Sequence, residues 1–388
     1  MGPSAAVFIV RRHRPRRRGP AIGAAPGLGV LAAAFGPLVP RRLAGLVAVA
    51  ADQDGTHEWS AGTWRTLHAT GATAAAGGGG GGGGNDAPAV FQLASITKVF
   101  TAVLLADAVA AGLVRLDQPV EELLAAPLRV GGAPVTLRHL ATHRAGLPFL
   151  PESAPDEPDF DPRDPYRTYD ADRLVAAATA AATRDHVRPG RRPPQRYSNF
   201  GFALLGLALA RGYGTSYEQA LHERILAPAG LTDTSLRPSR PRAVHTDEHG
   251  EIIRPQEFAA FGPAGGLWTT AADLARWLTL LTESVTTDTT GATGTTADPE
   301  ARPTADRRRV RDLVRTTMAP QVGTNRSGLG LAWWLSARHG LASHGGGVPG
   351  SSSYLAVDQN HATAVGVLAL GNSGEHLDLA ARRALTGR

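Results

Sequence analysis

A serine and a lysine stand one helical turn apart in the segment Ser95-Ile96-Thr97-Lys98, at the start of a predicted helix over residues 97–111. Residues i and i+3 share one helix face, so the two side chains are expected to lie side by side. A serine hydroxyl becomes a good nucleophile when a base takes its proton. A lysine is such a base only as a neutral amine. The spacing predicts acyl transfer with Ser95 as nucleophile and Lys98 as its activator.

The amino-acid composition also supports a chemical role for Lys98. The chain has 40 basic residues, and Lys98 is the single lysine among them. Arginine can replace lysine where only positive charge is needed, but its pKa is too high for it to supply a neutral amine. Retention of one lysine at this position therefore favours a chemical role for its amine over an accidental occurrence.

A second motif is Tyr197-Ser198-Asn199, which precedes a predicted helix over residues 202–211. A tyrosine phenol can move protons, and an asparagine amide can orient a substrate amide. The same three residues are also typical of a plain helix N-cap, and taken alone the motif favours that structural interpretation.

A third motif is His344-Gly345-Gly346-Gly347, between two predicted strands. Glycines allow a substrate backbone to lie close to a strand edge, and a histidine can supply charge for a carboxylate or a hydrogen-bond donor. Taken alone, the pattern favours a glycine-rich turn with an incidental histidine.

The three motifs in this order resemble the motif set of the serine β-lactamase and penicillin-binding protein family. The tyrosine of the second motif resembles the branch that contains class C β-lactamases, D-alanyl-D-alanine carboxypeptidases and related esterases. The resemblance covers residues 43–388, and four further segments are similar to that branch: residues 91–94, 137–148, 228–234 and 265–274. These four segments are expected to be framework, and His143 within the second is expected to be structural rather than a base.

The resemblance implies a role for each motif residue. Ser95 would form an acyl-enzyme, while Lys98 and Tyr197 would share proton handling, with the identity of the base left open. Asn199 would position the substrate, and His344 and Gly346 would line its binding site. The N–H groups of Ser95 and Gly347 would form an oxyanion hole.

One departure from the family pattern bears on the substrate. Many class C β-lactamases begin the third motif with lysine, whereas this chain has His344 there. A neutral histidine holds a β-lactam carboxylate less firmly, which favours a peptidase or esterase over an efficient β-lactamase. The substrate is expected to be a small-molecule or peptide acyl compound. The alternative is a penicillin-binding or sensor protein on the same fold with little or no turnover.

The order of predicted elements indicates the fold that must position these motifs. Strands are predicted over residues 43–50, 59–67, 329–336, 353–357 and 363–370, and helices over residues 97–111, 137–143, 171–183, 202–211, 217–226, 271–281 and 377–385. This order predicts an α+β, β-lactamase/transpeptidase-like fold: an antiparallel sheet of about five strands flanked by helices, with an inserted, mainly helical region. The sheet part is expected from residues 43–91 and 328–388, and the helical part from residues 92–282. Long loops are expected over residues 151–166 and 283–308.

Charge and composition exclude several other functions. Residues 1–42 hold eight arginines and no acid, and are expected to be disordered or an export signal, so localisation stays open between cytoplasmic and exported. The hydrolase domain of residues 43–388 holds 32 basic and 34 acidic residues, which excludes a nucleic-acid-binding body. The sequence has no cysteine, no metal-binding motif, no dinucleotide fingerprint and no apolar run long enough for a transmembrane segment. Neither a cofactor nor a metal is expected. The glycine run of residues 77–84 is expected to be a flexible loop. The sequence does not indicate an oligomeric state.

Overall fold

The computed structural model describes residues 8–9, 27–39, 43–62, 64–67, 73–76, 89–182, 195–246, 251–286, 304–324 and 327–386. The glycine run of residues 77–84 and most of the basic segment of residues 1–42 lie outside the described residues, as do residues 287–303 of the second predicted loop.

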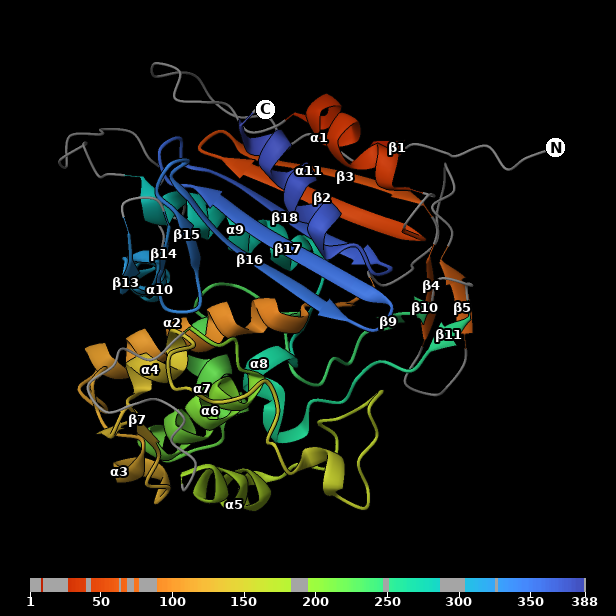
Figure 1. Cartoon of the computed structure of the whole chain (residues 1–388). Helices are drawn as coiled ribbons and strands as arrows, with labels where there is room; N and C mark the ends of the chain where they lie inside the picture. Colours follow the sequence, from red (N-terminus) through yellow and green to blue (C-terminus); the bar gives the residue numbers. More distant parts are fainter. Residues whose placement is uncertain are drawn as a thin grey trace.

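An antiparallel sheet forms the upper half of the molecule in Figure 1. Its strand order is β1-β3-β2-β18-β17-β16-β15-β14-β13. The centre consists of five strands of eight residues each: β3 (Gly55–Gly62), β2 (Gly45–Asp52), β18 (Thr363–Leu370), β17 (Ser351–Asp358) and β16 (Leu341–Val348). The outer strands are β1 (Phe8–Ile9), β15 (Trp334–Ser336), β14 (Gly328–Leu329) and β13 (Val322–Gly323). The α+β class is confirmed, but the sheet is larger than predicted. The central strand β16 was not predicted, because glycines occupy three of its eight positions, and the short strands β1 and β13 were not predicted either. The predicted strand of residues 329–336 is divided into β14 and β15.

Both faces of the central strand β2 are covered, which explains why it is a nearly continuous apolar run. Leu46 and Ala48 of β2 belong to the apolar cluster under two helices, α1 (Leu28–Phe35) and α11 (Gly374–Thr386). Val47 and Val49 point to the opposite face and join the larger core. Successive residues of a strand alternate between faces, so a strand buried on both sides can be apolar at successive positions, as β2 is from Leu46 to Ala51.

Helix α1 belongs to the folded domain, although the sequence placed the start of that domain at residue 43. Leu31 and Phe35 are fully buried in a cluster that also contains Trp59 of β3. Figure 1 shows α1 beside α11 on the same side of the sheet, and the two helices are in contact. The glycines and prolines around this segment weakened the helical signal in the sequence.

The other face of the sheet carries α9 (Ala271–Val285), which packs against β2 and β18. Helix α10 (Ala305–Met318) packs against α9 and α2. The sequence predicted a loop up to residue 308 and no helix beyond it, and α10 corrects this. Its buried residues Val310, Leu313, Val314 and Met318 have helical spacing, but the arginines between them hid the pattern.

The helical part forms the lower half of Figure 1. Its helices are α2 (Thr97–Ala110), α3 (Glu121–Leu124), α4 (Leu137–Ala141), α5 (Ala171–Ala182), α6 (Asn199–Tyr213), α7 (Tyr217–Leu221) and α8 (Gly262–Gly265). A π-helical turn, His222–Leu226, continues α7. Small pairings outside the main sheet involve β4 (Trp64–Leu67), β5 (Thr73–Ala76), β6 (Phe91–Gln92), β7 (Arg129–Val130), β8 (Ala133–Pro134), β9 (Arg242–Ala243), β10 (His245–Thr246), β11 (Ile252–Ile253) and β12 (Trp268–Thr269). Across the described ranges, none of the helices has both the length and the apolar character needed to cross a membrane.

A buried carboxylate ties α2 to its neighbours. Asp107 is 2% exposed and accepts hydrogen bonds from Tyr213 Oη at 2.7 Å and Arg224 Nε at 2.8 Å. Arg309 of α10 also pairs with it. Because a buried charge is tolerated only when it is paired, this cluster fixes α2, which follows the nucleophile turn, against α6, α10 and the turn after α7.

Candidate active site

Ser95 lies in a 3₁₀ turn (η2, Ala94–Ile96) that leads directly into α2. Its side chain is partly exposed, while the residues on both sides of it are buried. The preceding residue, Ala94, has a φ of +47°, a left-handed conformation that is uncommon for a residue with a Cβ. The turn therefore presents the hydroxyl at the surface of an otherwise closed core.

Lys98 is fully buried one turn further on. Its Nζ lies 3.1 Å from Ser95 Oγ, 2.7 Å from Asn199 Oδ1 and 2.6 Å from the carbonyl oxygen of Ala264. The amide and carbonyl oxygens can only accept hydrogen bonds. In the neutral amine, two N–H groups would serve these two oxygens and the lone pair would remain for the Ser95 hydroxyl.

Burial favours this neutral form. None of the three polar contacts of Lys98 is a carboxylate. Desolvation therefore lowers the pKa of Lys98 well below its ordinary value, because an ammonium loses its hydration without gaining an opposite charge.

Tyr197 completes the immediate surroundings of the nucleophile. Its hydroxyl hydrogen-bonds with Ser95, and its ring centroid lies 4.8 Å from Lys98 Nζ. Burial raises the pKa of Tyr197 well above its ordinary value, although the hydrogen bond with Ser95 opposes this shift. Tyr197 is therefore a neutral phenol beside Ser95.

Ser198 and Asn199 begin α6. Ser198 is the N-cap, and its Oγ accepts from Gly201 N at 2.8 Å, so the structural interpretation of the motif holds for this residue. Asn199 is buried, with Oδ1 accepting from Lys98 and Nδ2 donating to Tyr166 Oη at 2.7 Å. Both ends of the amide are thus engaged inside the protein, and Asn199 holds the Lys98 amine in place.

Two contributors to the site were missed by sequence reasoning. Tyr166, at the end of the loop of residues 151–166, binds Asn199 and stacks on Phe258 with centroids 4.7 Å apart. The Ala264 carbonyl, in α8, accepts from Lys98. No motif or spacing marks either residue, because their roles depend only on the tertiary contact.

His143 contacts the second motif, at Tyr197 and Ser198. Its Nδ1 accepts from Ser198 N at 3.1 Å, and its ring packs on Tyr197 at 4.4 Å between centroids. Burial and the nearby Lys98 and His344 lower the pKa of His143 well below its ordinary value. The residue is buried and touches the motif backbone, consistent with the structural role expected for it.

The third motif lies within strand β16, which corrects the expectation of a glycine-rich turn between strands. All eight residues of β16 pair with β17, and His344 is opposite Leu355. A Cβ at Gly346 would overlap Ser353 Oγ and the Leu93 carbonyl oxygen, so only glycine lets the strand approach the Ser95 turn this closely. Pairing and this close approach outweigh the low strand propensity of glycine.

His344 is buried, 2% exposed, and its ring lies 6.4 Å from that of Tyr197 between centroids. Its Nδ1–H donates to the Gly345 carbonyl oxygen at 2.7 Å, which leaves Nε2 as the lone-pair nitrogen. Burial, with a smaller effect of Lys98, lowers the pKa of His344 to about 3. His344 is therefore neutral. This argues against the expectation that its positive charge could bind a substrate carboxylate.

The two later framework segments meet beside the site. Asp273, in the first turn of α9, accepts from Asp233 N and from Thr234 Oγ1, each at 2.8 Å. Trp268 pairs with Ser235 in an isolated bridge, and β12 (Trp268–Thr269) pairs with β6 immediately before the nucleophile turn. Residues 228–234 and 265–274 thus brace the approach to Ser95.

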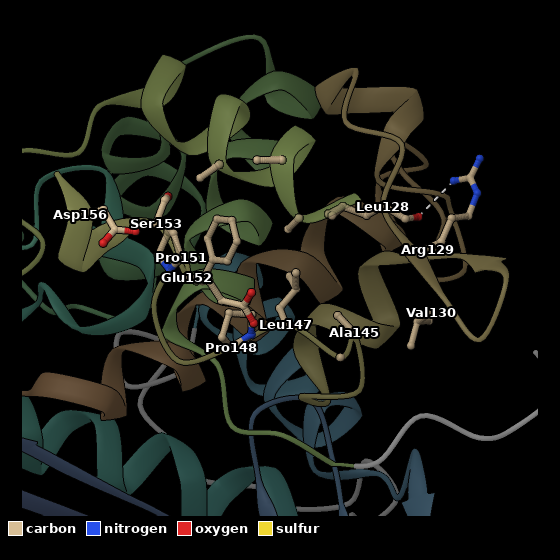
Figure 2. Close-up of a pocket in the computed structure, with 15 residues that line it drawn as sticks. Leu128, Arg129, Val130, Ala145, Leu147, Pro148, Pro151, Glu152, Ser153 and Asp156 are labelled. Atoms are coloured by element: carbon tan, nitrogen blue, oxygen red, sulfur yellow. Dashed lines mark hydrogen bonds between the residues drawn. The ribbon is translucent and has the colours of Figure 1, made fainter. Parts of the chain in front are cut away.

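A cavity of about 880 Å³ adjoins the site along β16. Tyr166 and residues 345–347 line it, together with apolar side chains that include Phe149, Phe160 and Val348. A smaller pocket of about 140 Å³, shown in Figure 2, lies on the helical part beside Leu147, Pro148 and Glu152. Ser95, Lys98 and Tyr197 line neither space, but Gly346 and Gly347 of the third motif line the larger cavity and not the smaller pocket, so the larger cavity is the candidate substrate cleft.

Comparison with known proteins agrees with this geometry. The model of the Beta-lactamase family matches residues 32–388. D-alanyl-D-alanine-carboxypeptidase/endopeptidase AmpH of Escherichia coli is 34% identical over 195 residues, which are 49% of this chain and 48% of that protein. Penicillin-binding protein 4 of Amycolatopsis lactamdurans is 30% identical over 205 residues, 48% of this chain and 49% of its own. The chain spans about half the length of the curated relatives it matches.

Solved structures show the same fold. A class C beta-lactamase from Rhodobacter sphaeroides superposes with a TM-score of 0.68 at 22% identity, covering 92% of this chain and 99% of that one. The octameric penicillin-binding protein homologue from Pyrococcus abyssi gives a TM-score of 0.67 at 19% identity, covering 93% and 77% of the two chains. The family match over most of the chain and this shared fold confirm the resemblance seen in the motifs, and the protein belongs to the Beta-lactamase family.

Proposed function

We propose that this protein is a serine hydrolase that transfers an acyl group from an amide or ester to Ser95 and then to water. The observation that carries the proposal is the environment of Lys98. Lys98 is buried, its Nζ donates to the acceptor-only oxygens of Asn199 and Ala264, and it lies 3.1 Å from Ser95 Oγ, so that as a neutral amine it would have its lone pair free for the Ser95 proton. This is the arrangement that a general base needs.

In the proposed acylation step, Ser95 Oγ bonds to the substrate carbonyl carbon as its proton passes to Lys98 Nζ. Tyr197 donates its phenolic proton to the leaving oxygen or nitrogen as that bond breaks, and Lys98 returns a proton to Tyr197. Water then attacks the acyl-enzyme, its proton passes to Lys98, and Ser95 recovers a proton as the acyl group leaves. The lowered pKa of Lys98 and the raised pKa of Tyr197 support Lys98 as the base and Tyr197 as the proton donor.

The remaining site residues have positioning roles in this proposal. The N–H groups of Ser95 and Gly347 would stabilise the oxyanion, and the close packing of Gly346 on Leu93 supports this because it brings β16 to the Ser95 turn. Asn199 would orient Lys98, and His344 would border the bound substrate. The names of the relatives, a carboxypeptidase/endopeptidase and beta-lactamases, support amide bonds as targets.

Covalent labelling tests the proposal. Wild-type protein is expected to react with a fluorophosphonate probe, a fluorescent penicillin or both, whereas Ser95→Ala is expected to react with neither. Failure of the wild type to label with either probe, or equal labelling of Ser95→Ala, would refute the acyl-enzyme.

Turnover separates the hydrolase from a penicillin-binding sensor. Steady-state hydrolysis of a p-nitrophenyl ester or of nitrocefin is expected for the hydrolase. A single burst that matches the enzyme concentration and then stops would favour the sensor.

A further inference from the structure

Tyr166 is a residue beside the site whose contacts lead to both oxygen acceptors of the Lys98 amine. We propose that Tyr166 is a positioning residue of the acylation step: its hydroxyl holds the Asn199 amide, and its ring braces the helix that carries the Ala264 carbonyl. This inference rests on the proposed hydrolase function and adds to it a residue that no sequence motif marks. Tyr166 acts through these two groups and exchanges no proton with Ser95.

The hydroxyl of Tyr166 fixes the far end of the Asn199 side chain. Asn199 Nδ2 donates to Tyr166 Oη at 2.7 Å, and Asn199 Oδ1 accepts from Lys98 Nζ at 2.7 Å. Tyr166 and Asn199 are each 4% exposed, so water has little access to this contact. Without the hydroxyl, a buried N–H group loses its partner and the amide is free to turn about its last side-chain bond. Such a turn would direct an N–H group at the amine and remove the oxygen that accepts from it.

The phenol of Tyr166 holds the amide without adding a charge. Burial raises the pKa of Tyr166 to about 12, so the hydroxyl is uncharged at neutral pH. A carboxylate in the same place could also accept from Asn199, but its negative charge would favour the ammonium form of Lys98. A neutral phenol is therefore compatible with a neutral amine at Lys98.

The ring of Tyr166 contacts the segment that carries the second acceptor. It stacks on Phe258 with centroids 4.7 Å apart and lies against Phe261 at 4.9 Å between centroids. The Phe258 ring packs directly on Gly265, where an added Cβ would lie 2.3 Å from it. Gly265 follows Ala264 in α8, and the Ala264 carbonyl is that second acceptor. The hydroxyl and the ring thus act on different groups, and removal of the hydroxyl alone separates their effects.

Tyr166 also lines the candidate substrate cleft, so a direct contact with the substrate is the competing role. A group that contacts the substrate changes how tightly a probe binds. A group that positions the base changes the rate at which the bound probe reacts. Labelling measured at several probe concentrations separates the two roles.

Fluorophosphonate labelling of Tyr166→Phe tests the positioning role. This variant keeps the ring and removes the hydroxyl, and its maximal labelling rate is expected to fall about tenfold or more. The probe concentration that gives half of that rate is expected to stay within about twofold of wild type. Tyr169→Phe is the matched control, because Tyr169 is also buried and packs on Phe261, but its hydroxyl donates to Glu157 at 3.0 Å. Its labelling is expected to equal that of wild type.

A double-mutant cycle shows whether the effect passes through Asn199. In an Asn199→Ala background, Tyr166→Phe is expected to change the maximal labelling rate by less than about twofold, because the amide that the hydroxyl holds is already absent. An equal fall with and without the Asn199 amide would overturn the proposal.

The outcomes distinguish this inference from the proposed function. Labelling of Tyr166→Phe at the wild-type rate would overturn the inference while leaving the hydrolase intact. A raised half-maximal probe concentration with an unchanged maximal rate would also overturn it, and would indicate a contact with the bound probe. An equal loss in Tyr169→Phe would overturn it as well, because the effect would then be a general loosening of the aromatic cluster. Failure of the wild type to label with this probe or with a fluorescent penicillin would instead overturn the proposed function.

Discussion

At the scale of single residues, the chemistry of Ser95 depends on the protonation of Lys98. The fold removes the lysine from water and gives it an amide oxygen and a backbone carbonyl but no carboxylate among its hydrogen-bond partners. An isolated ammonium is costly in such surroundings, so the folded state itself selects the neutral amine. Arginine cannot reach that state, which gives a physical reason for the single lysine in an arginine-rich chain.

Substitution of Lys98 tests the amine role. Lys98→Arg keeps the charge but cannot take a proton, and Lys98→Met keeps an unbranched side chain without an amine. Both changes are expected to lower the fluorophosphonate labelling rate by about 10²–10⁴-fold. Labelling of Lys98→Arg at the wild-type rate near pH 7 would contradict the neutral-amine role.

The stability of the same Lys98→Met variant is a second prediction, and measuring it also shows whether the variant folds. Burial lowers the pKa of Lys98 in the folded chain, so below the ordinary lysine pKa the unfolded chain binds this proton more tightly, and the lysine costs stability that methionine does not. Urea unfolding is expected to show Lys98→Met at least as stable as wild type at pH 7. The difference should shrink as the pH rises towards the ordinary lysine pKa of about 10.4.

The pH dependence of acylation follows from the lowered pKa of Lys98. Labelling is expected to be constant above the lowered pKa of Lys98 and to fall about tenfold per pH unit below it, because protonation removes the base. His344, with a pKa lowered to about 3, and His143, whose pKa is also lowered, stay neutral at higher pH and do not produce this limb. Labelling rates between pH 4.5 and 10.5 check this. A rate that rises only near the ordinary lysine pKa would contradict it.

At the scale of elements, three helices hold the Lys98 amine in place. Helix α2 carries Lys98, α6 begins with Asn199, and α8 supplies the Ala264 carbonyl. Gly206 of α6 packs directly on Pro263 of α8, and the Pro263 carbonyl accepts from Thr101 Oγ1 of α2 at 2.7 Å. The position of the Ala264 oxygen therefore depends on close contact between α6 and α8.

Gly206→Ala tests this contact. The added Cβ would overlap the Pro263 ring and push α8 away from α6. A stability loss of about 1–3 kcal/mol is expected in urea unfolding, with a lower labelling rate as the Ala264 carbonyl shifts. Gly212→Ala, in the same helix, is the matched control because its Cβ would lie 3.1 Å from Val114 Cγ1 and not touch Pro263. Equal effects of the two changes would show that the α6–α8 contact does not matter.

At the scale of the whole molecule, the site lies where the helical part meets the sheet. Ser95 and Lys98 belong to the helical side, and Gly346 and Gly347 to strand β16. The central strands that support β16 are packed on both faces, by α1 and α11 on one and by α9 on the other. The packing that supports β16, and with it the third motif, therefore includes helix α1.

Helix α1 is expected to contribute to global stability. Phe35→Ala removes a fully buried ring and is expected to cost about 3–5 kcal/mol in urea unfolding. Val30→Ala, in the same helix at a residue that is 45% exposed, is the control and should change stability by less than about 0.5 kcal/mol. Wild-type stability of Phe35→Ala would show that α1 is not part of the core.

The sequence by itself determined the features that depend on neighbouring residues. The Ser95–Lys98 spacing, helix α2 and strand β18 follow from local periodicity, and the continuous apolar run of β2 already indicated a buried strand. The order of the three motifs was enough to indicate the family. Helices α10 and α1 were not predicted, because the arginines within α10 and the glycines around α1 interrupt the apolar pattern of each helix.

Only the tertiary structure decided the features that depend on residues far apart in the chain. Lys98 meets Asn199 and Ala264, which follow it by 101 and 166 residues, and Tyr166 reaches Asn199 from a loop without a motif. The glycines of the third motif form a strand because β17 pairs with it and the Ser95 turn packs against Gly346. Burial, which no local pattern measures, lowers the pKa of both Lys98 and His344.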